Sequence, residues 1–161
     1  MKTTYLKTSA IVITLLLGFV LALVLVSRQS KPAASDKLKI VASSNVWGDI
    51  AAQIGGDQVE VTSILNDPEA DPHLFESDAN TAAKLGSANL IIINGLGYDE
   101  FMDKLLAASP NENTLTVSDV FKSQADANPH LWYDLPRIPE VAAAIQNKLI
   151  ELDPANEEQY K

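Results

Sequence analysis

The sequence contains no cysteine, and it is poor in histidine and in basic residues. It has 2 histidines, and 12 lysines and arginines against 21 aspartates and glutamates, for a net charge of -9 over 161 residues. Without cysteine, disulfide scaffolds, thiol catalysis and zinc–cysteine sites are excluded. The acidic balance argues against nucleic acid as a partner, because phosphates require a basic surface. An acidic surface suits a cation ligand, although it more often serves solubility.

The N-terminus carries the longest apolar run, residues 10–26, flanked on both sides by lysine or arginine. A basic start followed by such a run is typical of an export signal. The run is also close to the roughly 17–25 residues that span a bilayer, and no good cleavage site follows it. We therefore expect residues 1–27 to be a signal peptide or a membrane anchor, with a buried core helix as the alternative, and residues 28–37 to be a flexible tether.

Downstream of the tether, short apolar runs alternate with helical patterns. Strands are predicted at 38–43, 59–65, 89–94 and 113–119, and helices at 45–55, 78–88, 98–109 and 137–152. Asn45 is a candidate N-cap, and Gly55-Gly56 a stop signal. This order predicts an α/β fold in which a four-stranded parallel sheet has helices on both faces, as one lobe over residues 38–153.

Both histidines occur in the same local frame, Asx-Pro-His. His73 lies in DPHLFE, after the second predicted strand, and His130 in NPHLWYD, after the fourth. The carboxyl ends of parallel strands share one edge of the sheet, where ligands bind in open α/β folds. Two histidines that are distant in the sequence can therefore converge on one crevice.

Metal binding is the chemistry that this pair favours. Neutral imidazole is the commonest side-chain ligand for zinc and similar metals, and the prolines stiffen each frame. Asp71, Glu76 and Asp134 are candidates to orient an imidazole through its second nitrogen. The alternative is that His73 and His130 are ordinary surface or capping residues.

Other candidates are weaker. The segment NGLGY, residues 94–98, lacks the third glycine of a dinucleotide loop and is better explained as a tight turn. No serine has a histidine and carboxylate arranged as at a nucleophile elbow. Trp47 and Trp132 are expected to be packing groups. The acidic segment DPEAD, residues 67–71, is most simply a solvated loop.

Four segments together resemble the metal-binding receptors of bacterial zinc and manganese ABC importers: DPHLFE, SANLIIINGLGYDEFMDKL, NPHLWYD and LDPANEEQY. The resemblance covers residues 38–161. It implies two α/β lobes joined by a long helix, with a metal held between them by four ligands. His73 and His130 match the first two ligands. The third, a histidine or glutamate, and the fourth, an aspartate, belong to the second lobe, which is missing here; residues 154–161 would begin the helix between the lobes.

The resemblance therefore implies an extracytoplasmic receptor that binds zinc or manganese, delivers it to a membrane permease, and is not an enzyme. We expect attachment to the membrane, if any, through the N-terminal segment. The lipid-attachment cysteine of many such receptors is absent, and so is the histidine-rich loop of some zinc-selective ones. Two imidazoles favour zinc over manganese, although manganese sites also use histidine.

Three alternatives remain open at this point. The chain could be a surface adhesin or binding module with an incidental metal site, a metal-dependent α/β hydrolase, or a truncated receptor without a transport role. A hydrolase would need a third ligand and turnover of esters or phosphate esters. An adhesin would bind host matrix without its histidines.

Overall fold

The computed structural model describes residues 37–67 and 69–161. The predicted signal or anchor at 1–27 lies outside these residues, as does the predicted tether at 28–37 except for Lys37. The strands are β1 (Leu38–Ser44), β2 (Val59–Leu65), β3 (Leu90–Ile93) and β4 (Thr114–Thr116). The helices are α2 (Asn45–Gly55), α3 (Ala79–Gly86), α4 (Glu100–Ala108), α5 (Val117–Val120), α6 (Ile138–Leu152) and α7 (Glu157–Tyr160). Short 3-10 turns occupy Gly56–Gln58, Leu131–Tyr133, Leu135–Arg137 and Pro154–Asn156.

The four strands form one parallel sheet in the order β2-β1-β3-β4, which confirms the predicted fold class. The connection from β1 leads to β2 at one edge of the sheet, and the connection from β3 leads to β4 at the opposite edge. The strand order therefore reverses between β1 and β3. In open α/β sheets, the crevice at the carboxyl ends of two such strands is the usual ligand site.

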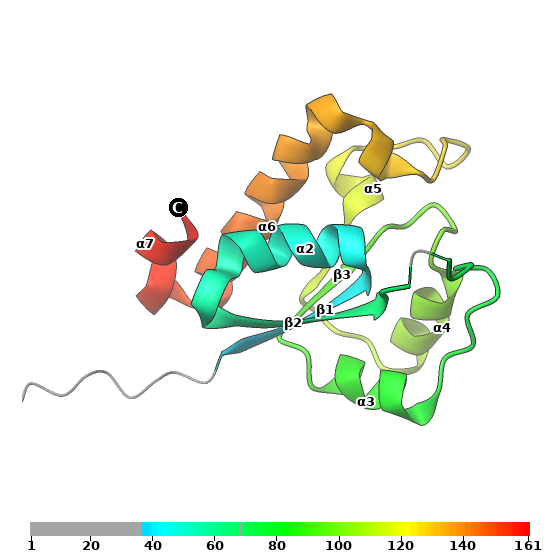
Figure 1. The fold of residues 1–161 in the computed structure, drawn as a ribbon, viewed down its shortest axis with the longest axis horizontal. Helices are drawn as coiled ribbons and strands as arrows, with labels where there is room; N and C mark the ends of the chain where they lie inside the picture. Colours follow the sequence, from blue (N-terminus) through cyan, green and yellow to red (C-terminus); the bar gives the residue numbers. More distant parts are fainter. Residues whose placement is uncertain (1–36, 68) are drawn as a thin grey trace, which may run out of the picture. The chain divides into compact units, whose positions relative to one another are not determined.

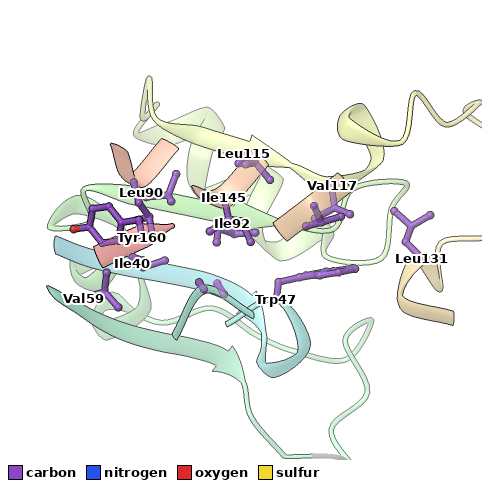
Figure 2. Close-up of a cluster of buried hydrophobic side chains, with 14 of the residues drawn as sticks. Ile40, Trp47, Val59, Leu90, Ile92, Leu115, Val117, Leu131, Ile145 and Tyr160 are labelled. Carbon is purple, nitrogen blue, oxygen red and sulfur yellow. The ribbon is translucent and has the colours of Figure 1, made fainter. Parts of the chain in front are cut away.

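Helices cover both faces of the sheet (Figure 1), with α2 and α6 on one face and α3 and α4 on the other. β3 shows how the sequence encodes this arrangement, because all four of its residues are buried. Leu90 and Ile92 pack into the cluster under α2 and α6 (Figure 2), whereas Ile91 and Ile93 pack into the cluster under α3 and α4. Each such side chain contributes roughly 1.5–3 kcal/mol when fully buried, so the apolar run confirms a strand covered on both sides.

Two local predictions are wrong. The N-cap of α2 is Ser44 rather than Asn45, which is the first helical residue. The fourth strand ends at Thr116 rather than at residue 119, and α5 begins directly after it. The reason lies in β3, whose pairing with β4 ends at Ile93 because the chain then enters a turn with positive φ at Gly95. Beyond Thr116, β4 has no strand to pair with.

The C-terminal segment folds back onto α6. Tyr160 is 2% exposed and belongs to the same core cluster as Trp47, and its hydroxyl donates a hydrogen bond to Asp153 Oδ2 at 2.7 Å. These contacts attach α7 to the lobe. No helix within residues 37–67 and 69–161 is both long and apolar enough to cross a bilayer.

Candidate metal centre

Both histidines lie in loops that leave the carboxyl edge of the sheet. His73 is in the connection from β2 to α3, residues 66–78, which we call the first histidine loop. His130 is in the connection from α5 to α6, residues 121–137, which we call the second histidine loop. Figure 1 shows both loops on the same side of the molecule, beyond the ends of the strands. Both side chains are exposed.

The repeated Asx-Pro-His frame forms the same turn twice. The backbone N–H of His73 donates to Asp71 Oδ1 at 2.9 Å, and the backbone N–H of His130 donates to Asn128 Oδ1 at 2.9 Å. Each is an Asx turn, in which a side-chain oxygen binds the backbone two residues further on. The intervening proline lacks an N–H and has a fixed φ, so it fits the middle of this turn. The frame therefore sets the backbone geometry of each histidine.

Asn128 also determines the tautomer of His130. Its Oδ1 lies 2.7 Å from His130 Nδ1 as well. An amide oxygen can only accept, so Nδ1 is the donor in this contact, and in the neutral imidazole the lone pair is then on Nε2. That is the arrangement in which a neutral imidazole binds a metal, with the second nitrogen held by an acceptor. A neutral imidazole in this contact therefore has Nε2 available to a metal.

Three aromatic rings surround the His130 imidazole. The ring centroids lie 5.3 Å from Trp132, 6.0 Å from Tyr98 and 6.5 Å from Tyr133. These rings pack beside the imidazole, which itself remains exposed to solvent. Trp132 is half-buried and Trp47 fully buried, so both tryptophans pack as predicted, and Trp132 does so beside the site.

Tyr98 packs against the second histidine loop. Its ring packs against Trp132 at 4.9 Å, and against His130 in the second loop. Burial raises the pKa of Tyr98 above its ordinary value, as do the negative charges of Asp99 and then of Asp71 in the first loop. The phenol is therefore protonated at neutral pH, and it lies within electrostatic reach of the first Asx-Pro-His turn.

The NGLGY segment forms the tight turn expected of it. Gly95, Leu96 and Gly97 all have positive φ, at 82°, 55° and 73°. The buried Asp99 carboxylate accepts hydrogen bonds from the backbone N–H groups of Asn94 at 2.6 Å and Gly95 at 3.0 Å. These amides are therefore not free to hold a phosphate.

Sequence reasoning missed Asn94. Its side-chain amide is fully buried and donates to the Pro129 carbonyl at 2.9 Å, directly before His130. The available signal was a polar residue at the end of an otherwise apolar strand, since buried amides require partners.

The predicted orienting carboxylates do not contact the imidazoles. Asp71 holds the backbone of His73 rather than its ring. No hydrogen bond in the described part of the chain joins Glu76 or Asp134 to either histidine. Asp134 does share a cavity of about 560 Å³ with His130 and Asn128.

The described residues supply an incomplete ligand set. Within 37–67 and 69–161, no group of three or more His, Asp or Glu side chains is arranged to hold a metal ion. Two imidazoles are half of the four ligands that a closed zinc site takes. The large apolar side chains that are most exposed also lie in these two loops: Leu74 at 77%, Tyr133 at 76% and Leu135 at 71%.

A family comparison agrees with this geometry. The sequence model of the zinc-uptake complex component A (ZnuA) family, which is periplasmic, matches residues 40–161. The chain belongs to this family. Its members are solute-binding receptors for metals and are not enzymes, so the expectation that the chain is not a hydrolase is confirmed.

Each curated relative matches this chain over about half of its own length. The chain is 29% identical over 128 residues to the manganese-binding lipoprotein MntA of Halalkalibacterium halodurans, covering 76% of this chain and 42% of that protein. It is 29% identical over 167 residues to the iron ABC transporter substrate-binding lipoprotein MtsA of Streptococcus pyogenes, covering 92% and 54%. The chain thus spans about half the length of the curated relatives it matches.

Among solved structures, the periplasmic zinc-binding protein TroA of Treponema pallidum superposes with a TM-score of 0.67 at 25% identity, covering 77% of this chain and 47% of TroA. The fold is therefore that of one half of such a receptor. The relatives are named for manganese, iron and zinc, so the expected preference for zinc finds no support among them.

Proposed function

We propose that this chain is the N-terminal, metal-binding lobe of an extracytoplasmic receptor that captures a divalent transition metal for an ABC importer. The observation that carries the proposal is the pair of identical Asx-Pro-His turns at the carboxyl edge of the sheet. His73 and His130 are the proposed ligands. Glu76 and Asp134 are at most outer contacts that would form once a metal is bound.

Metal capture would depend on how the two imidazoles are presented. His130 presents a free Nε2 lone pair because Nδ1–H is held by Asn128, and His73 supplies the second imidazole from the opposite loop. Water or groups outside the described residues complete the coordination. The acidic net charge of -9 raises the local concentration of cations around the molecule.

The surroundings of the site support a two-lobe receptor. The exposed Leu74, Tyr133 and Leu135 flank the histidines, and apolar groups at such an edge are expected to be covered when a second lobe closes over it. We propose residues 38–153 as the first lobe and 154–161 as the start of the connection to the second. The N-terminal segment would hold the receptor at the outer face of the membrane, near its permease.

Zinc is the proposed first choice of cargo, because two neutral imidazoles suit it. Manganese and iron are the alternatives that the relatives suggest, and the third ligand would decide between them. Titration of the receptor with each ion separately, at one pH, tests the order.

The ligand assignment is tested by His73→Ala and His130→Ala in a receptor that includes the second lobe. Each change removes one of four ligands, so we expect zinc or manganese affinity to fall well over tenfold. Isothermal titration calorimetry measures the affinity, and thermal unfolding of the metal-free variants checks that the fold is kept. Unchanged affinity in both variants would contradict the assignment.

The 161-residue chain alone should bind metal weakly, because two ligands leave the ion half hydrated. Dialysis against a chelator is expected to remove all bound zinc. A stoichiometric ion that resists the chelator in a monomeric chain would show that the described residues hold a complete site.

A further inference from the structure

The second histidine loop is fastened to the sheet through one side chain. Asn94 is 0% exposed and lies immediately after β3. Its Nδ2 group donates to the carbonyl oxygens of Gly95 at 3.0 Å and Pro129 at 2.9 Å. Both amide hydrogens are thereby used, one of them on the residue that precedes His130.

Trp47 of α2 determines which way this amide faces. The indole Nε1–H donates to Asn94 Oδ1 at 3.1 Å. An indole can only donate, so the oxygen of the amide must face Trp47 and the nitrogen must face Pro129. The reversed amide would place oxygen against the Pro129 carbonyl and nitrogen against the indole N–H, which loses both hydrogen bonds in a buried place.

The orientation is transmitted to the imidazole over three consecutive residues. The φ of Pro129 is fixed by its ring, and its carbonyl is fixed by Asn94, so the peptide between Pro129 and His130 has one orientation. On the other side of the proline, Asn128 Oδ1 holds both the backbone N–H and Nδ1 of His130. Movement of the Pro129 carbonyl would therefore shift the imidazole against its acceptor.

We infer that Asn94, oriented by Trp47, is a positioning residue for His130: it keeps the Asn128-Pro129-His130 turn in the geometry that leaves Nε2 free for a metal. The inference deepens the proposed function and rests on it for the metal, but the positioning itself can be measured in the metal-free protein. Among the described residues, the hydrogen bonds of the His73 turn are all within the first loop, so His73 has no equivalent there.

The test uses Trp47→Phe and Asn94→Asp in the full chain. Trp47→Phe removes the N–H that orients the amide and keeps a smaller aromatic ring in the core. Asn94→Asp keeps the acceptor for Trp47 but removes the donor to Pro129. Tyr160→Phe is the matched control, because it also deletes one donor from an aromatic residue of the same cluster (Figure 2), at the end far from Trp47.

The primary readout is the imidazole tautomer, measured by long-range ¹H–¹⁵N NMR correlation without metal. The chain has only two histidines, so His73 is an internal reference in every spectrum. We expect wild type to show His130 as the Nδ1–H tautomer alone, and both variants to show a mixture of tautomers at His130 with His73 unchanged. Tyr160→Phe should leave both histidines as in wild type.

The second readout is a Zn²⁺ titration followed at the His130 signals. A contact that orients a metal ligand is worth about tenfold or more in metal affinity, so half-saturation should need about ten times more Zn²⁺ in either variant. A single Nδ1–H tautomer that persists in folded Trp47→Phe and Asn94→Asp would overturn the positioning role. So would an equal change in Tyr160→Phe. If wild type shows no Zn²⁺ response at either histidine, the proposed function fails, while the tautomer measurement still decides the role of Asn94.

Discussion

The two histidine loops are built on the same turn, but they are anchored differently. The first loop is held by internal hydrogen bonds that Asp67 and Asp71 accept from backbone N–H groups, and by packing of Phe75 on Phe101 of α4 at 4.6 Å. The second loop is fastened to a distant part of the chain, because Asn94 after β3 donates to the Pro129 carbonyl at 2.9 Å; it also has an internal hydrogen bond from Arg137 Nη2 to the Phe121 carbonyl at 2.9 Å.

The difference concerns preorganisation. A ligand that is already oriented loses little conformational freedom when a metal binds, whereas a ligand on a locally held loop must be ordered at that moment. As proposed ligands, His130 would be of the first kind and His73 of the second. We therefore expect His130 to receive the ion, and the first loop to adjust to it. The following predictions test this contrast, from the largest expected effect to the smallest.

Asp99→Ala should have the largest effect, because it removes the acceptor that holds the turn carrying Asn94. The substitution leaves two buried backbone N–H groups, those of Asn94 and Gly95, without their acceptor. We expect the free energy of unfolding to fall by about 3 kcal/mol, measured by urea denaturation. Asp67→Ala is the matched change in the first loop, where an exposed carboxylate accepts from Glu69 N–H at 2.9 Å, and it should cost less than about 1 kcal/mol. Equal losses would show that the loops are held alike.

Gly95→Ala should distort the turn that carries Asn94. The φ of Gly95 is +82°, and a Cβ there would lie 2.3 Å from Ser118 Oγ and 2.9 Å from Thr116 Cγ2. We expect a loss of about 2 kcal/mol in the free energy of unfolding. In Gly86→Ala, the new methyl would meet nothing within 4 Å. Alanine restricts the unfolded chain more than glycine does, so the free energy of unfolding should rise slightly. A harmless Gly95→Ala would contradict the proposed rigidity of this turn.

Asn128→Ala and Asp71→Ala compare the two Asx turns directly. Asn128 holds both the backbone and the ring of His130, so its loss should weaken zinc binding to the two-lobe receptor about tenfold. Asp71 holds only the backbone of His73, and its loss should cost about threefold. Calorimetry of both variants beside wild type measures the ratio. A larger effect at Asp71 would reverse the assignment of the oriented ligand.

Asp78→Ala should give the smallest effect, at the end of the first loop. Asp78 caps α3, and hydrogen bonds from the backbone and hydroxyl of Thr81 hold its pKa below the ordinary 3.8. Because the folded-state pKa is lowered, the contribution to stability is present above pH 3.8 and disappears as pH falls through the folded-state value. The difference between wild type and variant in urea midpoint should therefore close at low pH. A difference of constant size down to about pH 2 would argue against a role for the charge.

The sheet and the placement of both histidines could be predicted from the sequence, because period and strand order are local signals. The four strands and their parallel arrangement follow from alternating apolar runs and helices. The end of β4 could not be predicted, since residues beyond Thr116 have no strand partner only because the chain turns away after Ile93, at Gly95. Residue types alone also suggested the wrong role for Asp71, whose carboxylate was expected at an imidazole and lies on the backbone instead.

The hydrogen bonds that hold the turn of His130 were harder still to predict from the sequence. Asn94 is separated from Pro129 by 35 positions and from Trp47 by 47, and no short-range pattern connects residues so far apart. The Asx-Pro-His frame indicated that both histidines matter. It did not indicate that the turn of His130 is hydrogen-bonded to the core, whereas the hydrogen bonds of the His73 turn are within its own loop.

The strand order has a consequence for synthesis of the chain from its N-terminus. β1 pairs with β2 on one edge and with β3 on the other, and β3 is the later of the two to emerge. Until residues 90–93 are available, β1 has an open edge with Val41 uncovered on one face, a state that invites pairing with other chains. A nascent chain paused between β2 and β3 therefore exposes this edge, before the strands that position the second histidine loop are available.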